Sequence, residues 1–238
     1  MATPAEVSHL LQRNGNRIEE RMAAACYRAG RSRSEVTVVA ISKYVDVATT
    51  KLLFEAGQHD LGESRPQVIW EKVAAIPEAR WHLVGHLQRN KVARTLPLVS
   101  LIHSVDSFRL LQAINEEAAK LNKVQEILLE LHLTDEETKS GFSSEEWPQL
   151  PSHVAGLNHI KVTGLMGMAA LEGTPDEARQ TFARLRELRD QWQPLLASPH
   201  QLHHLSMGMT GDFELAILEG ATIVRIGSAF FEGILPGK

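Results

Sequence analysis

Apolar residues gather in eight short runs along the chain, separated by segments in which apolar positions follow helical spacing. Most of the runs are too short for a buried helix and rich in β-branched residues, so we predict that they form strands. The first run, VTVVAIS, is apolar at nearly every position, which is typical of a strand covered on both faces. The predicted strands are residues 36–42, 59–62, 81–84, 99–105, 127–133, 161–166, 201–205 and 222–226.

A long amphipathic segment precedes the first strand. It begins at a capping box made by Thr3 and Glu6, and it ends at Gly30, a residue suited to a helix C-terminus. Thr174 and Glu177 repeat the capping box later in the chain. Between the strands we predict helices over residues 49–56, 66–75, 87–96, 107–121, 175–192 and 212–219, with a short one after residue 143.

One helix followed by eight strands that alternate with seven helices is the pattern of a (β/α)8 TIM barrel. A doubly wound open sheet is the alternative. The length of 238 residues suits one barrel, and no stretch rich in proline, glycine and serine divides the chain. We therefore expect a single domain over residues 1–238.

Charge and cysteine content narrow the classes of partner. The formal net charge is -4, so the chain lacks the positive field that supports binding to nucleic acid or to anionic lipid. No apolar stretch is long enough to cross a bilayer, and the start lacks the apolar core of a secretory signal. Cys26 is the only cysteine and cannot form an internal disulfide. We expect a cytoplasmic protein with no nucleic-acid or membrane partner.

Two glycine-containing loops follow the last two predicted strands. In barrels of this kind the loops after strands seven and eight commonly hold phosphate, because their backbone N–H groups can approach its oxygens. Either loop alone is more often a plain turn. Together the loops contain Ser206, Met207, Gly208, Met209, Gly227 and Ser228.

Lys43 stands at the end of the first predicted strand, and Arg225 lies in the eighth. In a closed barrel these two strands are neighbours, so Lys43 lies beside the phosphate loops. An amine placed there can condense with an aldehyde, although a lysine at a strand end often only reaches solvent. An amine, a phosphate site and an arginine match the three ends of pyridoxal 5'-phosphate (PLP).

Motifs spread over almost the whole chain resemble the pyridoxal phosphate homeostasis protein family, also called YggS or PROSC, and are most similar to its cyanobacterial PipY branch. They occur in family order. The motifs are VAISK (39–43), LGESR (61–65), WHLVGHLQRNK (81–91), HSVDS (103–107), KSG (139–141), GLM (164–166), LSMGM (205–209) and VRIG (224–227).

The resemblance implies a barrel like the N-terminal domain of alanine racemase, fold type III of the PLP proteins. It implies that PLP, a form of vitamin B6, is bound covalently as a Schiff base on Lys43. Arg225 matches the arginine that faces the pyridine nitrogen. The family usually has asparagine where this chain has Ser64, so a water can replace a direct contact there. The phosphate site implied by the motifs is Ser206, the amides of Met207, Gly208 and Met209, and Gly227 with Ser228.

Two further residues complete the expected cofactor site. Met166 stands at a strand end, where its flexible side chain can pack around the cofactor ring. His86 lies near the end of the third strand, at the same end of the barrel. His82 and His86 are four residues apart, but on a strand and turn this spacing does not predict a zinc site.

An arginine at the pyridine nitrogen favours a carrier over an enzyme. A guanidinium only donates hydrogen bonds, so the ring nitrogen stays unprotonated and withdraws electrons weakly. We therefore expect a protein of PLP homeostasis that holds PLP without classical enzyme turnover and hands it to PLP-requiring apo-enzymes. The resemblance to the family implies a monomer.

Two other functions stay open. One is a PLP-dependent amino-acid racemase, with Lys43 as one base and His82 or His86 as the other. Alanine racemases take their second base, a tyrosine, from an additional domain, and the only tyrosines of this chain are Tyr27 and Tyr44. The other function is a phosphosugar-binding barrel without PLP.

Overall fold

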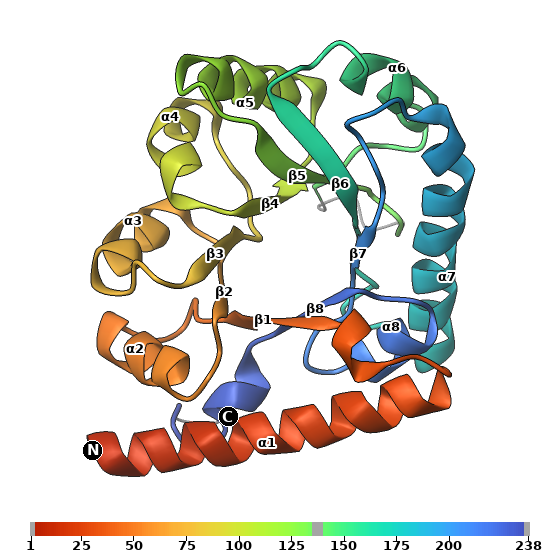
Figure 1. Cartoon of the computed structure of the whole chain (residues 1–238). Coiled ribbons are helices and arrows are strands. Elements are labelled where there is room, and N and C mark those ends of the chain that lie inside the picture. Colours follow the sequence, from red (N-terminus) through yellow and green to blue (C-terminus); the bar gives the residue numbers. More distant parts are fainter. Residues whose placement is uncertain (1–2, 135–139, 236–238) are drawn as a thin grey trace.

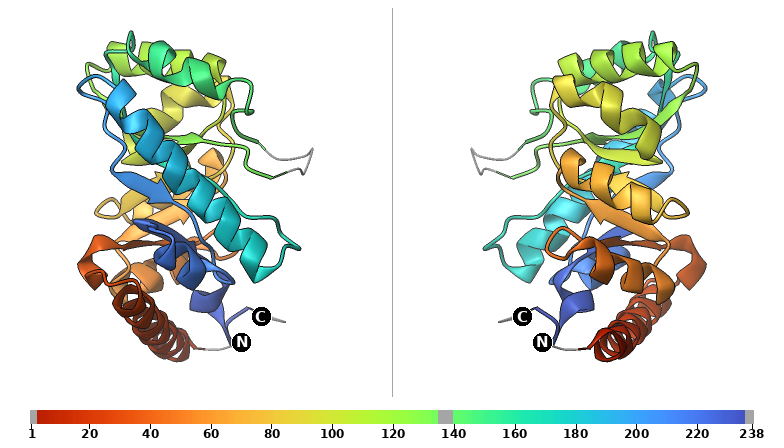
Figure 2. Two further views of the ribbon diagram at one scale, coloured as in Figure 1. Left: turned by 90° about the vertical axis from the view of Figure 1, so that its right-hand side faces the viewer. Right: turned by 90° about the vertical axis from the view of Figure 1, so that its left-hand side faces the viewer.

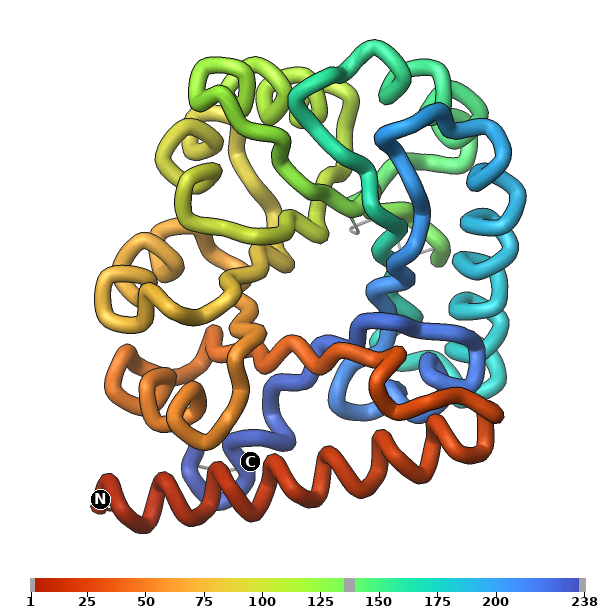
Figure 3. The backbone as a smooth tube through the Cα atoms, in the orientation of Figure 1, coloured from red at the N-terminus to blue at the C-terminus, as the bar shows by residue number. Residues whose placement is uncertain are grey.

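The computed structural model describes residues 3–134 and 140–235, so Lys139 of the KSG motif lies outside the described residues. Within these ranges, eight parallel strands follow one another in chain order and close into a barrel (Figure 1). The backbone trace in Figure 3 runs once around the ring. Because β1 also pairs with β8, the predicted barrel is confirmed and the open sheet is excluded. The strands are β1 (Thr37–Ile41), β2 (Asp60–Glu63), β3 (Arg80–Leu83), β4 (Leu101–Val105), β5 (Gln125–Glu130), β6 (Ile160–Met166), β7 (His204–Ser206) and β8 (Ile223–Ile226).

Helices surround the barrel in the places that the apolar spacing predicts. Both capping boxes are present, and the Thr3 N–H donates to Glu6 Oε2 over 2.7 Å. The helix predicted over residues 87–96 is broken into a short α-helix between two 3-10 turns. The helices are α1 (Pro4–Arg28), α2 (Val47–Glu55), α3 (Pro66–Ala75), α4 (Val92–Thr95), α5 (Phe108–Lys120), α6 (Leu150–Val154), α7 (Pro175–Trp192) and α8 (Phe213–Leu218). None of these helices combines the length and the apolar character that a membrane span requires.

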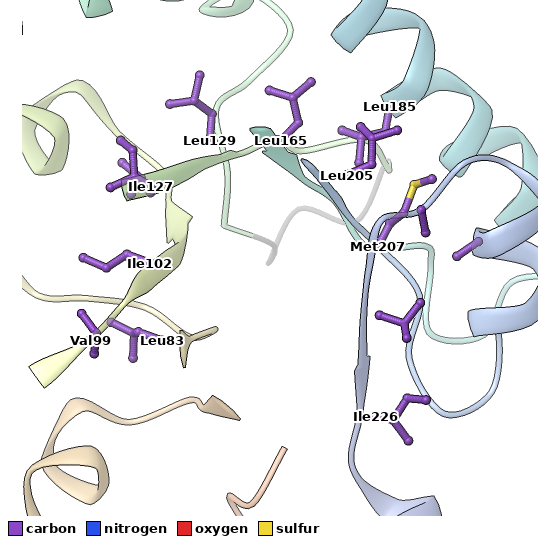
Figure 4. Close-up of a cluster of buried hydrophobic side chains, with 14 of the residues drawn as sticks. Leu83, Val99, Ile102, Ile127, Leu129, Leu165, Leu185, Leu205, Met207 and Ile226 are labelled. Atoms are coloured by element: carbon purple, nitrogen blue, oxygen red, sulfur yellow. The ribbon is translucent and has the colours of Figure 1, made fainter. Parts of the chain in front are cut away.

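Two layers of buried apolar side chains hold the barrel. The larger one lies between the strands and the helices, where Leu165 and Leu205 face the same layer as Leu185 of α7 (Figure 4). The smaller one fills the barrel interior. Its members are Val39, Ile41, Leu101, Leu128, Met166 and Ile223. Several polar side chains are also buried, among them His103, Ser206 and Arg225, so the core is not purely apolar.

Helix α1 crosses the outside of the barrel and packs on α8, α2 and the 3-10 turn Ser228–Phe231 (Figures 1 and 2). The Asn14 side chain, buried in this contact, donates from Nδ2 to the backbone oxygens of Phe230 and Glu232, each over 2.9 Å. The helix thereby holds the segment that follows β8.

Candidate functional site

A cavity of about 560 Å³ opens at the end of the barrel where the strands finish. Its lining includes residues that follow β1, β2, β3, β6, β7 and β8. The structure brings most of the predicted cofactor residues into this lining, but His86, Ser206, Met207 and Gly208 stay outside it. The predicted residues that line the cavity are Lys43, Ser64, Met166, Met209, Arg225, Gly227 and Ser228.

Lys43 follows β1, and its Nζ lies 4.8 Å from the centre of the Tyr44 ring. The backbone just before it is held by a buried cluster. Lys72 Nζ donates to the Ser42 backbone oxygen over 2.9 Å, and Ser42 Oγ donates to Glu63 Oε1 over 2.8 Å. Because Ser42, Glu63 and Lys72 are all buried, the end of β1 that presents Lys43 is firmly anchored.

The loop after β8 lies beside β1, as the closed barrel predicts. Val39 pairs with Arg225 and Ala40 with Ile226, so the two strands end side by side. Lys43, which follows β1, and Ser228, which follows β8, consequently line one cavity although they are far apart in sequence.

Two of the amides predicted to bind phosphate already have protein partners. The Met207 N–H donates to Ile223 O over 3.1 Å as part of the β7 and β8 pairing, and its side chain lies in the outer apolar layer (Figure 4). The Met209 N–H donates to Asp212 Oδ1 over 2.6 Å. Because these two N–H groups are already used within the protein, other N–H groups at the cavity are better placed to bind a phosphate.

In the loops that follow β7 and β8, three backbone N–H groups remain open at the cavity. Within residues 3–134 and 140–235, those of Thr210, Gly211 and Ser228 donate to no protein acceptor, and all three residues line the cavity. The Gly227 N–H donates to Thr210 Oγ1 over 3.3 Å, so the two loops touch. Sequence reasoning missed Thr210 and Gly211, although both stand in the small-residue loop that it singled out.

Gly208 shapes the turn between β7 and this loop. Its φ is +89°, in the left-handed region that favours glycine. A Cβ atom there would lie 2.6 Å from Ala216 Cβ and 2.9 Å from Phe213 Cα. Glycine is therefore required here by conformation and by space, even though Gly208 itself does not line the cavity.

Arg225 enters the cavity wall from inside the barrel. It is only 4% exposed, and it donates from Nη1 to Ser206 Oγ over 2.7 Å and from Nη2 to Gly167 O over 3.2 Å. Burial lowers the pKa of Arg225 to about 10, against the opposing effect of Glu130 and Asp212. The guanidinium is thus a fixed cation at neutral pH, and Ser206 contacts it from within the barrel.

The two histidines considered as racemase bases lie away from the cavity lining. His86 is exposed and its Nδ1 lies 2.9 Å from Asp106 Oδ2. His82 is buried, and its ring contacts His103 and Asp60. Neither ring is placed by the structure to face Lys43 across the cavity.

Small and apolar residues after β6 form another wall, most of which sequence reasoning did not find. Residues 168–171 and 173–175, which lead from β6 into α7, make up this wall. The cavity therefore combines an amine, a buried cation and open N–H groups with an apolar wall. This donor set suits an anionic molecule that carries both an aldehyde and an apolar ring.

One protein family and several known proteins match most of this chain in sequence. The family of the alanine racemase N-terminal domain matches residues 13–234. The pyridoxal phosphate homeostasis protein of Aquifex aeolicus is 40% identical over 218 residues, which cover 91% of this chain and 95% of the relative.

Two solved structures are also similar. A protein of unknown function from Bifidobacterium adolescentis is 32% identical with a TM-score of 0.89, covering 97% of this chain and 98% of the other. PipY of Synechococcus elongatus, solved with PLP bound, is 34% identical with a TM-score of 0.76, covering 90% and 99%. The chain therefore belongs to the pyridoxal phosphate homeostasis protein family, built on the barrel of the alanine racemase N-terminal domain.

Proposed function

We propose that this chain binds PLP covalently through Lys43 and holds the cofactor for the cell rather than turning over amino acids. The observation that carries the proposal is that Lys43, Arg225 and the open N–H groups after β7 and β8 line one cavity. The structure of PipY with PLP bound and the names of the homeostasis proteins support the same ligand.

The chain's own residues suit the three ends of PLP. Lys43 would supply the amine for the aldehyde end, and the N–H groups of Thr210, Gly211 and Ser228 would hold the phosphate end. When bound, the cofactor supplies a carbonyl that reacts with amines and a ring that withdraws electrons. Met166, which lines the cavity, would pack against the apolar part of that ring.

Arg225 determines how strongly the pyridine ring of PLP can withdraw electrons. Its guanidinium only donates, so the pyridine nitrogen accepts from it and stays unprotonated. Charge that develops on a substrate carbon is then poorly stabilised. This favours storage of a reactive aldehyde over rapid amino-acid chemistry.

The cellular setting is part of the proposal. Cys26 is free and buried, which fits a reducing compartment, and we place the protein in the cytoplasm. We propose that residues 1–238 act as one barrel and as a monomer, with PLP-requiring apo-enzymes as transient recipients.

Visible absorption spectra test the cofactor and its linkage. We expect the purified protein with added PLP to show an imine band that borohydride bleaches, and mass spectrometry to find the reduced adduct on Lys43. Lys43→Ala should lose the band, whereas Lys51→Ala, a change on the outer helix α2, should keep it. An adduct on another lysine would refute the linkage, and no band at all would refute PLP binding.

Turnover assays separate the carrier from a racemase. Alanine or serine enantiomers should racemise no faster with the loaded protein than with free PLP. Racemisation above that background, lost in Lys43→Ala, would establish the enzyme instead.

A further inference from the structure

A chain of buried hydrogen bonds leads from Arg225 at the cavity wall through the barrel. Arg225 Nη1 contacts Ser206 Oγ over 2.7 Å, and Ser206 Oγ lies 2.8 Å from His103 Nδ1. His103 Nε2 lies 2.9 Å from His82 Nδ1, and His82 Nε2 lies 3.1 Å from Asp60 Oδ1. Asp60 is the first residue of β2, so the chain ends at the opposite side of the barrel from the cavity.

The chemistry of the two end groups determines which atom donates and which accepts in each of these hydrogen bonds. A guanidinium can only donate, so Ser206 Oγ must accept from Arg225. An ionised carboxylate can only accept, so His82 must carry its proton on Nε2 and donate to Asp60. His82 Nδ1 then accepts a hydrogen bond from His103 Nε2–H, and His103 Nδ1 accepts a hydrogen bond from the Ser206 hydroxyl. Every link is satisfied with both histidines neutral.

The surroundings of His103 favour a neutral ring. His103 and Ser206 are fully buried, and His82 is 6% exposed. Burial lowers the pKa of His103 well below its usual 6.5, and the positive charge of Arg225 acts in the same direction. At the far end Arg80 donates to both Asp60 oxygens, from Nε over 2.7 Å and from Nη2 over 2.5 Å. The acceptor is therefore held as a carboxylate.

We propose that Asp60, His82 and His103 are positioning residues for Arg225. They keep the Ser206 hydroxyl donating its hydrogen bond to His103 Nδ1, so that the serine oxygen always presents a lone pair to the guanidinium. If the carboxylate of Asp60 is lost, a water molecule can take its place, and water can either donate or accept a hydrogen bond. The donor and acceptor roles along the series of hydrogen bonds are then no longer fixed. A reversed chain frees the Ser206 proton to turn toward Arg225, which weakens the contact that orients the guanidinium. The consequence for PLP rests on the proposed function, but the orientation of Arg225 does not.

NMR of the ligand-free protein tests the direction of these hydrogen bonds and the order of the Arg225 side chain. Long-range proton–nitrogen spectra, assigned with His82→Gln and His103→Gln, should show both rings protonated on Nε2 in the wild type. Slowly rotating Arg225 Nη–H signals should be visible. Asp60→Ala should give mixed ring tautomers and broadened Arg225 signals, whereas Asp60→Asn should largely restore the wild-type pattern because its Oδ1 still accepts.

Glu126→Ala is the matched control. Glu126 is another acidic residue near the start of its strand, and it pairs with Lys161 outside the chain of hydrogen bonds. It should leave the tautomers and Arg225 signals unchanged. Rings protonated on Nδ1 in the wild type, or Arg225 signals indifferent to Asp60→Ala, would overturn the proposal.

PLP binding provides the second readout. The Kd for PLP should rise about tenfold in Asp60→Ala and in Ser206→Ala, and stay unchanged in Glu126→Ala. Unchanged Kd values and PLP absorption bands in Asp60→Ala and Ser206→Ala would show that these hydrogen bonds do not position Arg225 for the ligand. A wild type that binds no PLP would refute the proposed function alone, because the Arg225 signals still decide the positioning role.

Discussion

Lys72 Nζ of α3 lies 2.5 Å from Glu63 Oε1 of β2, and both side chains are almost completely buried. The same ammonium donates to the backbone oxygen and the hydroxyl of Ser42, the residue just before Lys43. A buried ion pair is a poor source of net stability, but it is costly to break on one side. Here it ties a helix and two strand ends together under the proposed cofactor lysine.

We expect Lys72→Met to lower the free energy of unfolding by about 3–5 kcal/mol, because Glu63 is left as a buried charge without its partner. Urea unfolding measures this loss. The double variant Lys72→Met with Glu63→Gln should recover part of it, since the uncompensated charge is gone. A loss below about 1 kcal/mol in the single variant would show that the pair is dispensable.

Gly208→Ala should destabilise the protein by about 2 kcal/mol or more. Its positive φ disfavours a side chain, and the new Cβ would press on α8. Gly211→Ala, three residues on, is the control because its Cβ would meet no atom within 4 Å. Thermal or urea unfolding should show a change within about 0.5 kcal/mol for the control. Equal losses in both variants would contradict the steric reason.

Asp60 should support stability above its unfolded pKa and lose that contribution in acid. Burial raises its pKa, but hydrogen bonds from Arg80 and His82 outweigh this and lower it from 3.8 to about 2. The folded state therefore binds the proton less readily than the unfolded chain. Stability from this group is present above about pH 4 and lost as pH falls toward 2, with a size of about 2 kcal/mol.

Urea unfolding of wild type and Asp60→Asn between about pH 5 and pH 2 measures this contribution. The difference between the two proteins should shrink as the solution becomes more acidic. A constant difference across the range would mean that the carboxylate of Asp60 is not held ionised by its partners.

His103 should make the protein less stable below neutral pH. Because burial and the neighbouring charges hold its folded pKa well below 6.5, the unfolded chain takes up a proton that the folded chain refuses. Its contribution is present above about pH 6.5 and falls by up to about 1.4 kcal/mol for each pH unit below that value. His103→Gln should be less stable overall but show a flatter decline from about pH 7.5 to pH 5. Parallel declines would contradict a neutral, buried His103.

The pattern of apolar residues was enough to predict eight strands, the order of strands and helices, and both capping boxes, because these depend on neighbours a few residues apart. The pattern did not predict that the helix expected over residues 87–96 is a short α-helix between two 3-10 turns. Lys43 and the loop with Gly227 could be placed together from the sequence, since a closed barrel makes its first and last strands neighbours.

Only the tertiary structure decided which polar groups face the cavity and which have partners elsewhere. The Met207 N–H donates to Ile223 O of β8, whereas in the loops after β7 and β8 the N–H groups of Thr210, Gly211 and Ser228 stay open at the cavity. Ser206 contacts His103, which lies 103 residues away in sequence. Hydrophobic periodicity is a local property that the chain order alone determines. Hydrogen-bond partners depend on strand register and side-chain direction, which exist only once the barrel has closed.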